Sequence, residues 1–175
     1  TKRMRLLFNT GPLFYAEYNL RLFILLLFAR ADLLLANDLD TLLANHLARR
    51  GRKLVYDTHE FYTEVPELVG RPMVRRVWLA IERWIFPKLR TVITVNDSIA
   101  KAYRDRYGNT VHVVRNIPMK RELGPVPDRS ALGLPEDRRI LVMQGAGLNI
   151  QRGVEEAVLA MKDLPEEVAI DEGWK

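Results

Sequence analysis

Polar residues follow two short hydrophobic runs, where a parallel sheet would place a binding site. The segment 37–40 (NDLD) comes after the run 32–36 (DLLLA), and the segment 57–60 (DTHE) comes after the run 53–56 (KLVY). In doubly wound sheets, ligands bind beyond the carboxyl ends of the strands. The side chains of these two segments are therefore the first candidates for chemistry.

The first segment holds Asp38 and Asp40, and two interpretations of them stay open. Two carboxylates directly after a strand can bind sugar hydroxyls, or one of them can act as a base. Alternatively, Asp38 caps the helix expected over residues 39–50, and Asp40 complements the dipole of its first turn.

The second segment places His59 between Asp57 and Glu60. A histidine among carboxylates can donate a hydrogen bond to a sugar hydroxyl or to a phosphate. It can equally be a loop histidine that its neighbours satisfy. Carbohydrate is favoured by the aromatic and acidic residues that follow, because sugar faces pack on rings and sugar hydroxyls bond to carboxylates. These are Phe61, Tyr62, Glu64 and Glu67.

A third segment is the glycine-rich turn with Gly145 and Gly147, which lies between the run 139–144 (RILVMQ) and Arg152-Gly153. Such a turn lets backbone N–H groups approach a phosphate, and an arginine near the following helix adds positive charge. It is no Walker motif, since no Gly-Lys-Ser/Thr follows, and the G-x-G-x-x-G spacing fails at position 150.

Short apolar runs alternate with helical periodicity, which predicts βαβ units and a parallel sheet. The expected fold class is α/β, a Rossmann-like parallel sheet with helices on both faces. Strands are expected over 4–8, 32–36, 53–56, 91–95 and 111–115, and helices over 13–30, 39–50 and 72–86, with a further helix that Asp97 caps and that ends near 107–108. Residues 13–30 are apolar nearly all round, which predicts a well-buried helix, and the run 32–36 predicts a strand covered on both faces.

Prolines, glycines and charges concentrate in residues 117–138, which predicts a linker between domains. The expected organisation is a Rossmann-like domain over 1–116 that is incomplete at its start, this linker, and the truncated beginning of a second Rossmann-like domain over 139–175. One strand and one helix are expected in the second domain.

Composition narrows the class of protein. Nearly half of the 175 residues are hydrophobic, and the absence of cysteine excludes disulfides and thiolate zinc sites, which fits a reducing cytoplasm. A net charge of +5 predicts attraction to anions. The basic residues are spread along the chain without a recognisable nucleic-acid-binding motif, so no nucleic acid is expected as a partner. The longest apolar run, 22–29, is too short to span a membrane.

The helix expected over 72–86 has an apolar stripe, and beside it lie Arg75, Arg76 and Arg83. One interpretation is an amphipathic helix lying on a membrane of anionic lipids. The other is a core-facing stripe with a solvated basic rim.

The order of these segments resembles glycosyltransferase family 4. The resemblance rests on the segments 37–40 and 57–60, on 95–100 (VNDSIA), on 113–118 (VVRNIP), and on the run from Gln144 to Glu156. It covers most of residues 3–165 and is closest to bacterial members that work on surface polysaccharides. Each motif alone is loose, and their ordered succession is more specific.

The resemblance implies a GT-B fold, in which two Rossmann-like domains face each other across a cleft. The first domain would bind a glycan or lipid-linked acceptor, and the second a nucleotide-sugar donor. A hexose-type sugar would be transferred with retention of anomeric configuration, with no metal and no cofactor beyond the nucleotide-sugar as co-substrate. The expected location is the cytoplasm, with a peripheral contact at an anionic inner membrane face.

Carried over by position, His59 matches the family's active-site histidine, which contacts the donor sugar near the reacting centre. Asp38, Asp40 and Glu60 would face the acceptor, and Asn116 would begin the crossover between domains. Donor-binding residues would be Gly145, Gly147, Arg152 and Gly153.

Three features depart from the family pattern. The arginine expected near the first glycine of the donor domain is replaced by the stretch 146–148 (AGL). The Glu-x7-Glu segment that binds the donor is missing, and so is the first strand with its glycine-rich loop. A non-catalytic binding module that keeps only the acceptor half therefore remains an alternative, and a nucleic-acid-binding protein is a weaker one.

Overall fold

The computed structural model divides the chain into two compact units, residues 1–117 and 118–175. The structure describes residues 4–120, 122, 124–137, 139–143, 153–165 and 168–171.

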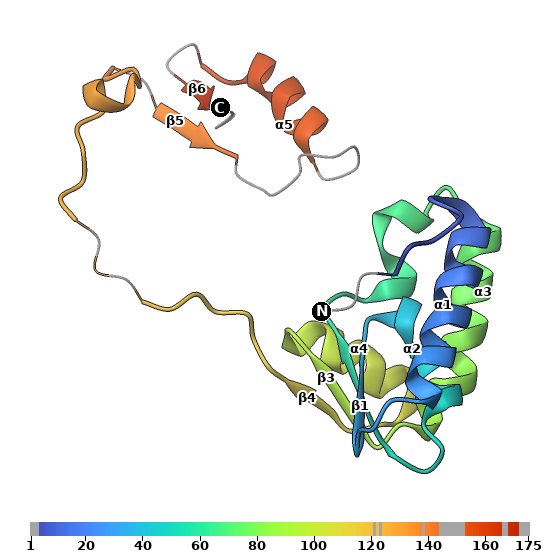
Figure 1. The fold of residues 1–175 in the computed structure, drawn as a ribbon. Coiled ribbons are helices and arrows are strands. Elements are labelled where there is room, and N and C mark those ends of the chain that lie inside the picture. The colour runs from blue at the N-terminus through green and yellow to red at the C-terminus, as the bar shows by residue number, and fades with distance from the viewer. Residues whose placement is uncertain are drawn as a thin grey trace. The chain divides into compact units, whose positions relative to one another are not determined.

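The first unit is a four-stranded parallel sheet in the order β1-β2-β3-β4. Its strands are β1 (Leu33–Asn37), β2 (Lys53–Thr58), β3 (Thr91–Thr94) and β4 (Val111–Val113). Its helices are α1 (Gly11–Leu27), α2 (Leu39–Ala48), α3 (Pro72–Ile85) and α4 (Asp97–Tyr107), with short 3-10 turns η1 (Tyr62–Glu64), η2 (Pro66–Leu68) and η3 (Phe86–Lys88). The predicted parallel α/β, Rossmann-like architecture is confirmed (Figure 1).

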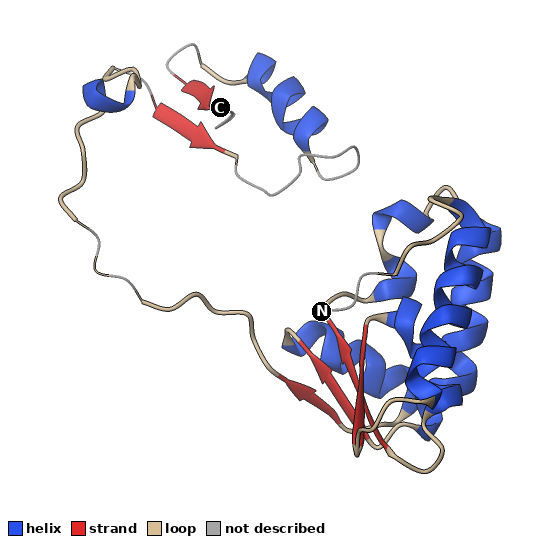
Figure 2. Ribbon diagram, viewed as in Figure 1, coloured by secondary structure: helices blue, strands red, loops and turns tan. Residues whose placement is uncertain are grey.

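The crossover helices α2, α3 and α4 lie on one face of this sheet (Figure 2). This follows from the strand order, because each right-handed crossover to the next strand in the same direction returns on the same side. Burial alternates accordingly in β1, where Leu34 and Ala36 are buried and Leu35 is 51% exposed. The sequence predicted that β1 is covered on both faces. The described residues cover one face only.

Aromatic rings fill the core between the sheet and its helices. Phe86 stacks on Tyr103 and Tyr107 at centroid distances of 4.7 and 4.5 Å. The rings of Phe86 and Tyr56 of β2 make a T-shaped contact with their centroids 6.0 Å apart. Burying a side chain of this size contributes about 2 kcal/mol relative to exposing it. This cluster fixes α4 against β2, the strand that leads into the segment of His59.

Two predictions near the N-terminus are wrong. Residues 4–8 form no strand, since the N–H groups of Leu7 and Phe8 donate to the Glu17 carboxylate at 2.8 and 3.1 Å instead of joining the sheet. Helix α1 contains no buried residue. It packs along α2 rather than on the strands, so it presents only one side to the protein (Figure 1).

The cap of α4 also differs from the prediction. Asn96, and not Asp97, is the N-cap residue, and its Oδ1 accepts from the N–H of Ile99 at 2.9 Å. Asp97 is the first helical residue and pairs with Arg115. Either side chain suits an N-cap, and the prediction took the wrong one of the two neighbours.

The second unit contains one βαβ arrangement. Strands β5 (Arg139–Val142) and β6 (Val168–Asp171) pair in parallel, and between them lie α5 (Val154–Ala160) and η5 (Met161–Asp163). Strand β6 was not predicted. The turn η4 (Ser130–Leu132) precedes β5 within the proline-rich stretch. That this unit begins a donor domain stays a prediction.

Candidate functional site at the carboxyl ends of β1 and β2

The parallel register brings the two polar segments together. Asn37, the last residue of β1, lies opposite Asp57 of β2. The N–H of Asp38 donates to the carbonyl of Asp57 at 2.9 Å, which extends the pairing one residue beyond β1. The segments after both strands therefore leave the sheet side by side, as expected for ligand sites in this kind of sheet.

His59 is flanked by two carboxylates at this edge. Its backbone N–H donates to Asp38 Oδ1 at 3.0 Å, and its Nδ1 lies 3.4 Å from Asp38 Oδ2. Its Nε2 lies 3.9 Å from Asp57 Oδ2, and its side chain is 41% exposed. The imidazole is thus oriented by neighbours and still open to solvent, which a ligand-binding histidine requires.

Asp38 adopts a backbone conformation that L-residues rarely take, with φ 57° and ψ 168°. This region is essentially restricted to glycine, and strain there costs about 1–3 kcal/mol. Asp38 occupies the N-cap position of α2 but makes no side-chain cap bond. The capping interpretation of its carboxylate is therefore wrong, because both oxygens are directed at His59 instead.

Asp40 lies in the first turn of α2, as the dipole interpretation expects, and is half-buried. Burial, followed by the negative charge of Asp38, raises the pKa of Asp40. Burial and the charge of Asp40 also raise the pKa of Tyr18 and of Tyr62, so these two hydroxyls lie within its field. Tyr18 was missed by the sequence analysis, because nothing in the pattern of α1 distinguishes it from the other apolar positions.

Glu60 is exposed, and its backbone carbonyl accepts from the buried hydroxyl of Thr58 at 2.7 Å. Glu64, in contrast, is engaged within the protein. Its carboxylate receives Arg75 at 2.7 Å and Arg106 at 3.2 Å. The suggestion that Glu64 serves carbohydrate therefore loses its basis, whereas Glu60 keeps its place at the edge.

Of the residues predicted to bind the donor, the structure describes only some. Gly145, Gly147 and Arg152 lie outside the described residues. Gly153 is described, with φ 81°, at the N-terminal end of α5. Asn116 is exposed in the stretch after β4 and belongs to the first unit.

The edge as a whole is rich in hydrogen-bond acceptors. The carboxylates of Asp38 and Asp57 flank His59, and Glu60 follows it in the chain. A fourth carboxylate, that of Asp40, lies within the field of Asp38. Within the described part of the chain, no group of three or more histidine and acidic side chains is arranged to hold a metal ion. Ionised carboxylates accept hydrogen bonds only, so this surface suits a ligand with many hydroxyl donors.

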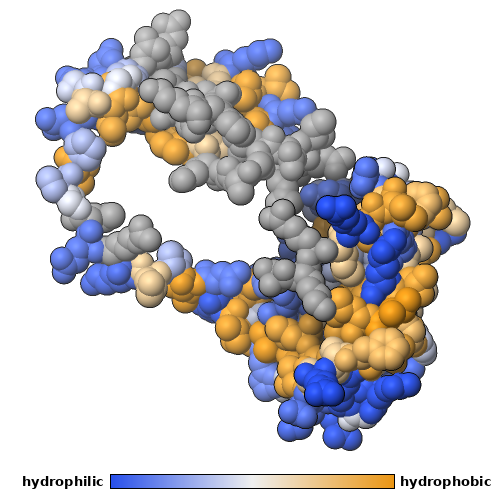
Figure 3. All heavy atoms as spheres, viewed as in Figure 1, coloured by the Kyte–Doolittle hydropathy of each residue, from blue (hydrophilic) through white to orange (hydrophobic). Residues whose placement is uncertain are grey.

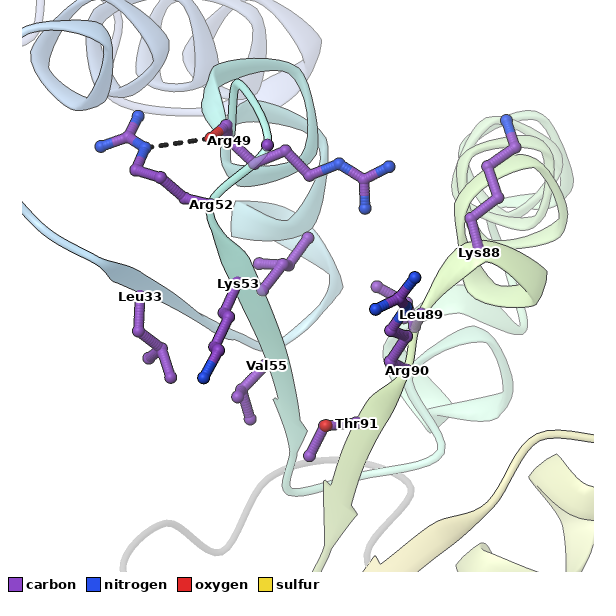
Figure 4. A pocket seen from close by; sticks show the side chains of 11 residues that line it. Leu33, Arg49, Arg52, Lys53, Val55, Lys88, Leu89, Arg90 and Thr91 are labelled. Carbon is purple, nitrogen blue, oxygen red and sulfur yellow. Dashed lines mark hydrogen bonds between the residues drawn. The ribbon is translucent and has the colours of Figure 1, made fainter.

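The opposite, amino end of the sheet has the reverse character. A cavity of about 670 Å³ there is lined by basic side chains over an apolar floor. Its basic residues are Arg49, Arg52, Lys53, Lys88 and Arg90 (Figure 4). Arg52 is engaged within the fold, because its guanidinium donates to the carbonyls of Leu26, Ala29, Ala48 and Arg49, at the ends of α1 and α2.

The sequence left open whether the apolar stripe of α3 faces a membrane or the core. Trp78 and Ile85 are buried, and Val74 and Ile81 pack against the core, so most of its apolar stripe faces the protein. Val77 and Trp84 are exposed, and Lys88 lies 4.7 Å over the ring of Trp84. Contact with an anionic membrane stays a prediction. No helix among the described residues is both long enough and apolar enough to cross a bilayer.

The first unit matches the model of a known protein family. The model of Glycosyltransferase Family 4 matches residues 1–117, which includes β1 to β4 and the whole edge around His59. No curated protein matches the chain.

Proposed function

The chain belongs to glycosyltransferase family 4, and from this we propose that it serves as a retaining glycosyltransferase. The proposed reaction moves a hexose-type sugar from a nucleotide-sugar to a glycan or lipid-linked acceptor, in the synthesis of surface polysaccharide. The single observation that carries the proposal is His59, held between Asp38 and Asp57 at the carboxyl edge of the family domain.

Charge assigns this edge to hydroxyls rather than to phosphates. The carboxylates gathered at this edge repel a diphosphate, whereas they accept hydrogen bonds from sugar hydroxyls. Asp38, Asp40 and Glu60 are accordingly the proposed contacts of the acceptor. The donor diphosphate needs cationic or N–H partners, and these are proposed at Gly145, Gly147, Arg152 and Gly153, with Asn116 at the crossover.

His59 is proposed to contact the donor sugar near its reacting carbon. A neutral imidazole has one donor and one acceptor nitrogen, so it can bind a sugar hydroxyl in either sense. Its backbone is fixed through the N–H bond to Asp38, which limits the positions that the ring can reach. Held in place in this way, the ring can contribute to transfer through orientation and hydrogen bonding.

The test is transfer by the full-length protein with a panel of nucleotide-sugars and acceptors, with product anomers assigned by NMR. Wild type should form product of retained configuration. His59→Ala should lower the rate about 100-fold or more, because positioned polar groups commonly contribute factors of that size. His112→Ala is the matched control, because His112 is exposed on β4 outside this edge, and its rate should stay near wild type.

Two results would contradict the proposal. Unchanged transfer by His59→Ala would remove His59 from the site. Saturable binding of acceptor or nucleotide-sugar by wild type, with no transfer or donor hydrolysis under any condition, would favour the non-catalytic binding module.

A further inference from the structure

The segment from His59 to Glu64 depends on side chains for its position. It leaves β2 and turns through η1, where the N–H of Glu64 donates to the carbonyl of Phe61 at 2.8 Å. Three side chains from elsewhere in the chain hold it, those of Asp38, Arg75 and Arg106. Asp38 binds its first residue, and α4 supplies Arg106 at its other end.

Arg106 contacts this segment in three ways. Its Nη1 donates to Thr63 Oγ1 at 3.2 Å, and its Nη2 donates to Glu64 Oε1 at 3.2 Å. Its guanidinium also lies 4.5 Å from the centroid of the Phe61 ring. A planar guanidinium with five donors can contact several groups in different directions at once, which a lysine cannot reproduce.

Arg106 is itself held by a buried carboxylate. Glu82 of α3 is fully buried, and its Oε1 lies 3.4 Å from Arg106 Nη1 and accepts from the hydroxyl of Tyr107 at 2.6 Å. Glu82 Oε2 has no hydrogen-bond partner among the described residues. The buried charge therefore relies on Arg106 for compensation, and the attraction fixes the guanidinium between α3 and the segment.

We propose that Arg106 is a positioning residue that holds the segment His59–Glu64 at the carboxyl edge of the sheet. It acts through Phe61, Thr63 and Glu64, and touches no ligand itself. Arg75 of α3 also holds the segment, donating to the Thr63 carbonyl at 2.8 Å and to the Glu64 carboxylate at 2.7 and 2.8 Å. That the held histidine serves sugar transfer rests on the proposed function, whereas the holding itself does not.

The test must separate lost positioning from an uncompensated buried charge. Glu82→Gln removes that charge and keeps an acceptor for Tyr107, with the contacts of Arg106 to the segment intact. The double variant Glu82→Gln/Arg106→Gln then removes those contacts without leaving Glu82 ionised and unpaired. Lys101→Gln in the Glu82→Gln background is the control, because Lys101 lies on the same helix, is 72% exposed and pairs with Asp105.

The readout is amide hydrogen exchange of His59 and Glu64 on this chain, compared with the core amide of Val92. In the double variant we expect the first two amides to exchange about tenfold faster or more than in Glu82→Gln, with Val92 unchanged. The Lys101 control should match Glu82→Gln. Equal exchange at His59 and Glu64 in the single and double variants would overturn the positioning role.

A second variant keeps the test decisive if Val92 also loses protection. Arg106→Lys retains a cation beside Glu82 but cannot make the several contacts of the guanidinium, so it should loosen the same two amides and leave Val92 protected. Protection equal to wild type in Arg106→Lys would count against the proposal. In the full-length enzyme, the double variant should lower kcat more than it raises KM, relative to Glu82→Gln. Absence of transfer in wild type, with the exchange effect present, would reject the proposed function alone.

Discussion

The two ends of the parallel sheet use their charged side chains in opposite ways. At the carboxyl end, Asp38 and Asp57 flank an exposed histidine. At the amino end, basic residues gather around a cavity, and hydrophilic residues cover that end of the first unit beside a hydrophobic band (Figure 3).

The pKa shifts of one group near each end reflect the different charges there. Burial and the charge of Asp38 raise the pKa of Asp40 at the carboxyl end. Burial, followed by the charges of Arg49 and Lys88, lowers the pKa of His46 toward the amino end. In both groups, burial and the neighbouring charges shift the pKa in the same direction. The neighbouring charges are negative at Asp40 and positive at His46.

The difference also concerns what the groups are for. Arg52 at the amino end spends its donors on helix carbonyls, which stabilises the fold. Asp38 at the carboxyl end strains its own backbone and forgoes a cap bond in order to meet His59. Strained backbone of this kind clusters at functional sites.

The largest predicted effect on stability is at the amino end. Arg52→Ala should lower the free energy of unfolding by about 3 kcal/mol, because bonds from a charged donor to several carbonyls at the ends of α1 and α2 are lost. Chemical denaturation measures this loss. Lys53→Ala, with an exposed side chain on the same cavity, should change it by less than about 0.5 kcal/mol. An equal loss of unfolding free energy in the two variants would contradict the structural role of Arg52.

A smaller effect is expected at the carboxyl end. Asp38→Gly and Asp38→Ala both remove the carboxylate, but only glycine suits φ 57° without strain. Asp38→Gly should therefore be more stable than Asp38→Ala by about 2 kcal/mol in denaturant titrations.

Arg50 offers the matched comparison, because it also has positive φ, at 46°, and lies outside the carboxyl edge. Arg50→Gly should exceed Arg50→Ala in stability in the same sense. An Asp38→Gly variant no more stable than Asp38→Ala would refute the strain assigned to this position.

The smallest effect concerns Asp40 and pH. Its pKa is raised above 3.8 in the folded state, so the folded protein binds the proton more tightly than the unfolded chain does. Stability is therefore lost as pH rises from 3.8 through the folded-state pKa. Asp40→Asn should be more stable than wild type at pH 7, and the gain should shrink as pH falls toward 3.8. Asp105→Asn, at a side chain 62% exposed, should show no such trend. A gain independent of pH would contradict the assignment.

Much of the fold was predictable because period and turn chemistry agree along residues 32–113. The strands β1 to β4 and the helices α2 to α4 lie within a few residues of their predicted places. Residues 4–8 and α1 were mispredicted for one reason. Apolar composition does not reveal whether a partner surface is present, and here α1 meets mainly α2.

The candidate site was predictable in its location and not in its bonding. Strand ends identified Asp38 and His59, since parallel strands place such residues at one edge. The direction of the Asp38 carboxylate depends on a backbone angle that sequence does not encode for an aspartate. Arg106 could not be found from local pattern, because it reaches Thr63 from 43 positions away.

The most direct test of the central claim is sugar transfer by the full-length enzyme carrying Asp38→Gly or Lys53→Ala, one change from each end of the sheet. Glycine suits the backbone conformation of Asp38, so the change removes the carboxylate, with its contact to His59 and its proposed contact to the acceptor, without adding strain. We expect at least a tenfold fall in kcat/KM for Asp38→Gly with a normally folded protein, and a rate within about twofold of wild type for Lys53→Ala. Normal transfer by Asp38→Gly, or an equal loss in both variants, would contradict the assignment of the chemistry to the carboxyl edge.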